Sequence, residues 1–89
     1  MITIYGMPSC PDCQYVYRQL KGREADYRVI DIGADVASLK PFVALRDADA
    51  AFDPVKAGGH LGIPCFVLEN GSVTFKPEEA GLSAFPAQD

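Results

Sequence analysis

A Cys-x-x-Cys pair that directly follows a strand and opens a helix constrains the fold of this chain more than any other feature. Residues 2–5 are apolar and mostly β-branched, and a loop with glycine and proline (residues 6–9) ends the run, which is typical of a buried strand. Cys10 and Cys13 follow, and Pro11 suits the first turn of a helix, where its missing N–H costs no hydrogen bond. The order strand, thiol pair, helix predicts redox chemistry more strongly than the cysteine spacing alone.

The helix that begins at this pair distinguishes the two thiols. Cys13, Val16, Tyr17 and Leu20 follow the spacing i, i+3, i+4 and i+7, so they form one apolar face. Cys13 should therefore be buried, whereas Cys10 should lie at the exposed helix tip among free backbone N–H groups. Thiol–disulfide exchange needs an accessible attacking thiolate and a shielded second thiol. We therefore predict that Cys10 is the nucleophile and Cys13 the resolving cysteine.

The middle of the chain predicts two further strands and more helix. Residues 27–32 alternate apolar and charged side chains, which favours an edge strand. A helix is expected near residues 40–47, with Pro41 in its first turn, and residues 52–57 add one or two helical turns. Residues 64–69 are strongly apolar, which indicates a central strand.

The end of the chain predicts a hairpin and a short helix. Asn70-Gly71 is typical of a type I′ turn, residues 72–76 return as the partner strand, and residues 77–80 resemble an acidic helix start. The order is β-α-β-α-β-β-α. We therefore expect one α/β domain over residues 1–89, with a four-stranded mixed sheet flanked by helices.

Composition limits the class of protein and its partners. With 48% hydrophobic and 22% charged residues, the 89-residue chain should form a globular domain. It contains no apolar run long enough to span a bilayer, and its start lacks the basic flank of a signal peptide, so we expect a cytoplasmic monomer whose thiols stay mostly reduced. The net charge is −4 and the eight basic residues are scattered, which argues against nucleic acid as a partner.

Other uses of the cysteines stay open. Cys65 is either a third thiol near the pair or a small buried residue of its strand. Cys10, Cys13, Cys65 and His60 would together make a Cys₃His zinc site, and the pair alone would suit a metal or iron–sulfur module. A redox-sensing interaction protein without turnover is a third class.

Three sequence features together resemble the glutaredoxin family, a branch of the thioredoxin fold, over nearly the whole chain. They are the motif Cys10-Pro11-Asp12-Cys13 after the first strand, the pair Ile63-Pro64 at the start of the third strand, and the Asn70-Gly71 hairpin. Residues 62–67 look like a bacterial glutaredoxin-related subgroup. The resemblance implies a thioredoxin-like fold and an oxidoreductase that reduces protein or low-molecular-weight disulfides. It also implies that no tightly bound cofactor is needed, and that electrons come from glutathione or a thioredoxin-reductase-like flavoprotein.

The resemblance also implies a substrate site beside the thiols. It implies a cis peptide bond before Pro64, the kind of bond in which cis costs little, so that the Ile63 backbone would pair with an extended substrate. Met7 and Pro8, in the loop before the pair, are expected to form the groove wall. Weaker contributors are Tyr15, Cys65, Glu78 and Glu79.

The chain departs from the usual glutaredoxin pattern in four places. The family usually has an aromatic residue where this chain has Asp12, often a lysine at Met7, and a threonine at Gly62. Its Gly-Gly pair after the third strand is replaced by Thr74-Phe75. A carboxylate beside Cys10 disfavours its thiolate. We therefore predict that Asp12, together with Pro11, lowers the reduction potential of the pair. The potential should be nearer that of thioredoxin, about −270 mV, than that of glutaredoxins, about −200 to −230 mV. The alternative is that Asp12 is an ordinary first-turn acid that stabilises the helix.

Overall fold

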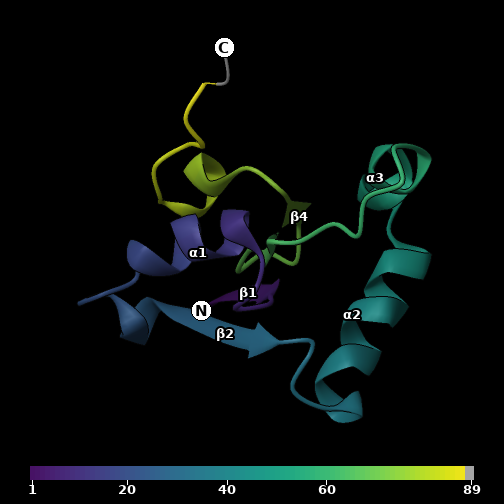
Figure 1. The fold of residues 1–89 in the computed structure, drawn as a ribbon, viewed down its shortest axis with the longest axis horizontal. Coiled ribbons are helices and arrows are strands. Elements are labelled where there is room, and N and C mark those ends of the chain that lie inside the picture. Colours follow the sequence, from purple (N-terminus) through teal and green to yellow (C-terminus); the bar gives the residue numbers. More distant parts are fainter. Residues whose placement is uncertain (88–89) are drawn as a thin grey trace.

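The computed structural model describes residues 1–87, and in them four strands form one mixed sheet in the order β2-β1-β3-β4 (Figure 1). The strands are β1 (Ile2–Gly6), β2 (Tyr27–Asp31), β3 (Cys65–Val67) and β4 (Val73–Thr74). β1 is parallel to β2 and antiparallel to β3, and β3 is antiparallel to β4. The edge position of β2 and the central position of β3 confirm the predictions.

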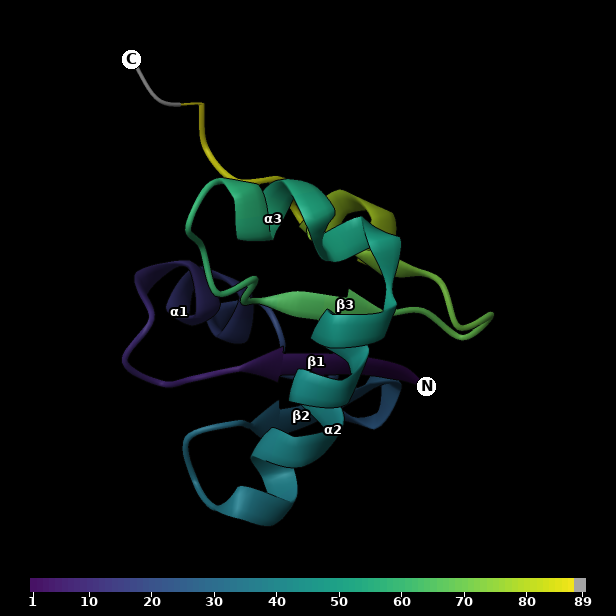
Figure 2. The same cartoon turned by 90° about the vertical axis from the view of Figure 1, so that its right-hand side faces the viewer.

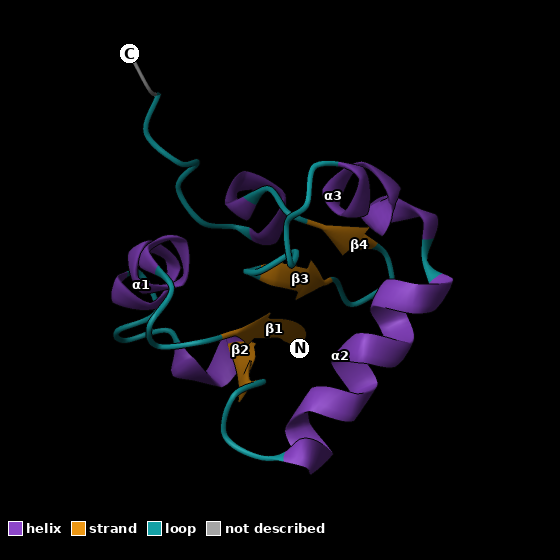
Figure 3. Ribbon diagram, turned by 45° about the vertical axis from the view of Figure 1, so that its right-hand side comes forward, coloured by secondary structure: helices purple, strands orange, loops and turns teal. Residues whose placement is uncertain are grey.

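Helices cover both faces of the sheet. They are α1 (Pro11–Arg18), α2 (Val36–Ala48) and α3 (Asp53–Ala57), with single 3₁₀ turns at Glu24–Asp26, Ala50–Phe52 and Pro77–Ala80. Figure 3 shows α1 on one side of the sheet and α2 on the other, and in Figure 2 α2 passes in front of the strands. The α/β thioredoxin-like arrangement is confirmed, and the short last helix is one 3₁₀ turn. No helix in residues 1–87 is long and apolar enough to cross a membrane.

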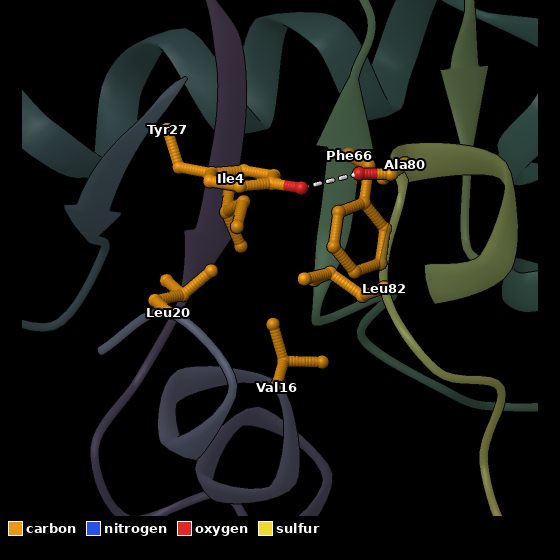
Figure 4. Close-up of a cluster of buried hydrophobic side chains, with 7 residues drawn as sticks. All are labelled: Ile4, Val16, Leu20, Tyr27, Phe66, Ala80 and Leu82. Atoms are coloured by element: carbon orange, nitrogen blue, oxygen red, sulfur yellow. Dashed lines mark hydrogen bonds between the residues drawn. The ribbon is translucent and has the colours of Figure 1, made fainter. Parts of the chain in front are cut away.

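Alternation along the strands divides the buried side chains into two clusters. The first cluster joins the sheet to α1 and the C-terminal segment: Ile4, Val16, Leu20, Tyr27, Phe66, Ala80 and Leu82 (Figure 4). Within it the Tyr27 hydroxyl donates to the Ala80 carbonyl oxygen over 2.7 Å. The second cluster, on the side of α2 and α3, contains Ile32, Phe42, Phe52 and Cys65. Neighbouring residues of β3, Cys65 and Phe66, thus enter opposite clusters.

Helix α2 begins four residues earlier than predicted. Asp35 caps it, because the carboxylate oxygen accepts from the Ser38 N–H over 2.7 Å. Pro41 consequently lies inside the helix rather than in its first turn. Its missing N–H removes one backbone bond of the helix. The Asp35 cap, together with the packing of Phe42 in the second cluster, outweighs that cost.

The hairpin between β3 and β4 is not the predicted type I′ turn. That turn needs a positive φ at two successive residues, but only Gly71 has one (φ 88°). The Leu68 N–H instead bonds the Ser72 carbonyl, and the Gly71 N–H bonds the Leu68 carbonyl, each over 2.9 Å. The connection is therefore a three-residue loop that ends in a left-handed glycine, and both strands are shorter than predicted.

Candidate functional site

The two cysteines of the motif occupy different environments at the start of α1. Cys10 is the N-cap residue and is partly exposed, and its Sγ accepts from the Cys13 N–H over 3.4 Å. Pro11 takes the first helical position, and Cys13, one turn further on, is completely buried. Both are free thiols. The helix start therefore presents one thiol at the surface and holds the other behind it.

The loop before Cys10 fixes the position of this cysteine. The Cys10 N–H donates to the Met7 carbonyl over 3.1 Å, and the Gln14 side chain donates to the Pro8 carbonyl over 2.9 Å. The Met7 side chain packs on Gly33, where an added Cβ would lie 2.8 Å from the Met7 Cε. Met7 and Pro8, which were predicted to line a groove, are thus seen to anchor the loop that leads to Cys10.

Burial keeps Cys13 protonated. Desolvation is the largest of the effects that raise the pKa of Cys13 to about 12. A hydrogen bond from the Met7 backbone opposes the increase, whereas the neighbouring Cys10 and the charge of Asp12 add to it. At neutral pH Cys13 is therefore a neutral thiol, and the Asp12 carboxylate acts against a negative charge at this site.

Gly6 and Tyr17 also belong to the site, although the sequence does not indicate it. A Cβ at Gly6 would lie 2.9 Å from the Cys13 Sγ and closer still to the Tyr17 hydroxyl oxygen, so only glycine fits. Tyr17 follows Cys13 by four residues on the same helix face. The spacing placed it in the core but gave no sign that its hydroxyl would lie near the sulfur.

A cavity of about 290 Å³ opens beside Asp12. Its lining residues are Asp12, Val55, His60, Gly62, Ile63, Pro64, Phe75 and Phe85. The peptide bond between Ile63 and Pro64 is cis, as predicted. Ile63 and Pro64 line the cavity, whereas Met7 and Pro8 do not. The cavity is mostly apolar, with one carboxylate and one imidazole.

Gly62 explains one departure from the family pattern. Its φ is +98°, and an added Cβ would lie 2.9 Å from the Phe52 Cε1 atom. A threonine here would be strained by the backbone and would clash with the ring. Gly62 therefore lets the loop close over Phe52 before β3 begins.

The weaker candidates have mostly structural contacts. Tyr15 donates from its hydroxyl to the Ala84 carbonyl over 2.7 Å and packs on Phe85, so it supports the cavity wall from behind. Glu79 accepts a hydrogen bond from the Thr74 hydroxyl, and Glu78 is exposed. Neither glutamate lines the cavity.

Cys65 belongs to the second cluster and is completely buried. Burial, and next the charge of Asp49, raises the pKa of Cys65 to about 12. The surroundings of Cys65 are therefore those of a small buried strand residue. In residues 1–87 no three or more His, Cys, Asp or Glu side chains are placed to hold a metal ion, so His60 and the three cysteines do not come together.

Several cavity residues were not recognised in the sequence. Val55 lies in α3, Phe75 directly follows β4 and Phe85 lies in the C-terminal segment, so no local pattern in the sequence joins them into one cavity. The sequence suggests His60 only as a zinc ligand, whereas in the structure it lines the cavity. Its loop is held by Arg46, which donates to the His60 carbonyl over 3.0 Å and to the Leu61 carbonyl over 2.9 Å.

Comparison with known proteins bears on the same region. The family model described as Glutaredoxin matches residues 2–48, which run from β1 to the end of α2 and make up more than half of the chain. A protein of Haemophilus influenzae described as "Uncharacterized protein" is 42% identical over 65 residues, which cover 73% of this chain and 76% of that protein. No solved structure gives a significant match.

Proposed function

This chain belongs to the glutaredoxin family, and on that premise we propose that it is a thiol–disulfide oxidoreductase that works through Cys10 and Cys13. The observation that carries the proposal is the pairing of a partly exposed N-cap thiol with a completely buried thiol one helical turn away. A helix N-terminus stabilises a thiolate, and a thiolate is the attacking species in disulfide exchange.

In the first half-reaction the Cys10 thiolate attacks a substrate disulfide. A bond forms between the Cys10 Sγ and one substrate sulfur, the substrate S–S bond breaks, and the second substrate sulfur leaves as a thiolate that takes a proton from water. The product is a mixed disulfide on Cys10. The partial exposure of Cys10 gives the substrate access to this sulfur.

In the second half-reaction Cys13 loses its proton and attacks the Cys10 Sγ. The Cys10–Cys13 disulfide forms, and the remaining substrate sulfur leaves and is protonated, so the substrate gains two electrons that the dithiol loses. Formation of the mixed disulfide helps this step, because Cys10 then carries no charge that opposes a thiolate on Cys13. Two electrons from an external thiol or flavoprotein restore the dithiol, and no tightly bound cofactor is needed.

The cavity beside Asp12 suits the substrate portion next to the disulfide. Its walls are mainly apolar, and neither lysine nor arginine is among its lining residues in the part of the chain that the structure describes. Glutaredoxins in general use glutathione-type partners. Here the carboxylates of glutathione would meet Asp12 rather than a cation, which is unfavourable. We therefore propose that the substrate is a protein disulfide, or a small-molecule disulfide, with apolar groups next to its sulfur atoms. We also propose that the reaction takes place in the cytoplasm.

Reduction of one model disulfide with two electron supplies, run in parallel, tests the proposal. One supply is glutathione with glutathione reductase, and the other is a thioredoxin reductase, each with NADPH consumption as the readout. We expect turnover with at least one electron supply. With glutathione as the supply, we expect a high KM for glutathione. Turnover that survives Cys10→Ser would contradict the mechanism, and efficient use of glutathione would contradict the role given to Asp12.

A further inference from the structure

The Tyr17 hydroxyl is the one buried side-chain polar atom in residues 1–87 that has no hydrogen-bond partner. The hydroxyls of Tyr15 and Tyr27, by contrast, donate to backbone carbonyls over 2.7 Å. A buried hydroxyl without a partner destabilises a fold, and natural structures contain few of them. An unpaired hydroxyl on the helix that carries the thiols therefore points to a use that the reduced protein does not display.

The nearest reactive group to this hydroxyl is the Cys13 thiol. Both groups lie against the α-carbon of Gly6, where a side chain would overlap with each of them. Burial and then Cys13 itself raise the pKa of Tyr17, with smaller contributions from Asp31 and Cys10. A weak side-chain interaction of the hydroxyl with the Cys13 sulfur also raises the Tyr17 pKa, but its geometry falls short of a full hydrogen bond, because the hydroxyl has no hydrogen-bond partner in residues 1–87. The raised pKa keeps the phenol protonated, so it can act as a donor but not as a base.

We propose that Tyr17 assists the second half-reaction by donating a hydrogen bond to the Cys13 Sγ as this sulfur gains negative charge. The inference rests on the proposed function, because only disulfide exchange requires Cys13 to become a thiolate. The proton that Cys13 releases passes through water to the departing substrate thiolate, and Tyr17 keeps its own proton throughout. The covalent balance of the step is therefore unchanged.

The electrostatic surroundings explain why such a donor matters. Asp12 acts on Cys13 and Asp31 acts on Tyr17, and no cation is among the groups that perturb the pKa of either residue. Apart from the Met7 backbone, little opposes the burial of a charge on this sulfur. A neutral thiol is a weak acceptor, whereas a thiolate accepts a strong, charge-assisted hydrogen bond. The hydroxyl should therefore find its partner only when Cys13 ionises.

Tyr17→Phe tests the inference, with Tyr27→Phe as the matched control. Each substitution removes one buried phenolic hydroxyl, but the Tyr27 hydroxyl donates to the Ala80 carbonyl, outside the site. Reduced protein is mixed with a limiting amount of a symmetric aromatic disulfide whose thiols absorb light on release. The first released thiol reports the attack by Cys10, and the second reports resolution by Cys13.

We expect Tyr17→Phe to slow the second release by about 10- to 100-fold, as the loss of a hydrogen bond to a charged group predicts, and to change the first by less than about twofold. Tyr27→Phe should leave both releases within about twofold of wild type. The denaturation midpoint of Tyr17→Phe should equal or exceed that of wild type, because an unpaired buried hydroxyl is lost. A purely structural role would lower the midpoint and slow both releases together.

An unchanged second release in Tyr17→Phe, or equal slowing of both releases, would overturn the inference and leave the proposed function standing. A wild-type protein that releases neither thiol would overturn the proposed function and the inference with it. These two failures are distinguished within one experiment, because the wild-type trace decides the first question and the variant the second.

Discussion

Two regions of this molecule contain a completely buried cysteine and a glycine whose surroundings leave no room for a side chain. In the first region, a Cβ at Gly6, the last residue of β1, would lie 2.9 Å from the Cys13 Sγ. In the segment that leads into β3, a Cβ at Gly62 would lie 2.9 Å from the Phe52 Cε1 atom. Cys13 and Cys65 are both completely buried, and burial raises the pKa of each to about 12. Burial alone therefore does not distinguish them.

Their neighbours do distinguish them. Cys13 has a partly exposed thiol, Cys10, one helical turn away and a buried hydroxyl beside it. Cys65 lies in a cluster with Ile32, Phe42 and Phe52, where no second thiol accompanies it. A buried thiol is thus unreactive by itself. It takes part in disulfide exchange only when an accessible thiol is held close enough to form a disulfide with it.

The largest expected effect separates the thiols by activity. Cys10→Ser should reduce disulfide turnover to the rate without protein, because a hydroxyl is a far weaker nucleophile than a thiolate. Cys65→Ala should keep turnover within about twofold of wild type, once assayed well below its unfolding temperature. The steady-state rate of NADPH consumption measures both. Loss of turnover in folded Cys65→Ala would break the comparison, because it would make the third thiol part of the reaction.

The two glycines should fail in different ways. We expect Gly6→Ala to lower kcat, because it pushes apart Cys13 and Tyr17, and Gly62→Ala to raise KM, because Gly62 lines the cavity. Each should lower the free energy of unfolding by about 1–3 kcal/mol through overpacking. Gly62→Ala should cost more, since its positive φ adds strain of about 1–2 kcal/mol.

Gly71→Ala is the control for the backbone contribution. Its φ of +88° is similar to that of Gly62, but no atom lies within 4 Å of an added Cβ. Denaturant unfolding should therefore rank the loss of stability with Gly62→Ala above Gly71→Ala. A reversed order would show that the Phe52 ring moves aside for the added methyl group without loss of folding stability.

The two buried thiols, Cys13 and Cys65, should contribute equally to the loss of folding stability at alkaline pH. A thiol with a pKa near 9.0 when unfolded and near 12 when folded keeps its proton only in the folded state between these values. The unfolded state therefore gains stability as the pH rises above about 9, and each thiol contributes a slope of about 1.4 kcal/mol per pH unit. Unfolding midpoints measured from pH 8 to 10 under reducing conditions should fall less steeply in Cys13→Ala and Cys65→Ala, and to a similar degree in both.

The smallest expected effect concerns Asp12, which acts on one thiol site only. Removing its charge with Asp12→Asn should favour the reduced dithiol and make the Cys10–Cys13 potential less negative by about 10–30 mV, or up to about tenfold in the equilibrium. Equilibration with a glutathione redox buffer measures this value. A potential equal to or more negative than that of wild type would contradict the tuning role and leave Asp12 as a first-turn helix acid.

Local signals in the sequence predicted most of the fold around the thiols. The pattern from β1 into α1 gave the strand, the helix start and the burial of Cys13 because each depends on neighbouring residues. The predicted start of α2 was wrong. Pro41 suggested that it lies in the first turn, but the Asp35 cap and the packing of Phe42 set the true boundary. Long-range packing also escaped prediction: Phe75 and Phe85 enter the cavity through tertiary contacts, and the proximity of Gly6 to the Tyr17 hydroxyl depends on how α1 lies on β1.

The most direct test of the roles given to Cys10 and Cys13 is to trap the mixed disulfide and locate it. Cys13→Ser is incubated with a disulfide substrate, and intact and peptide masses then report the number and position of adducts. The account predicts one stable substrate adduct on Cys10, whereas wild type should pass on to the Cys10–Cys13 disulfide and retain none. An adduct on Cys65, or a Cys13→Ser protein that carries no adduct while Cys10→Ser carries one on Cys13, would contradict it.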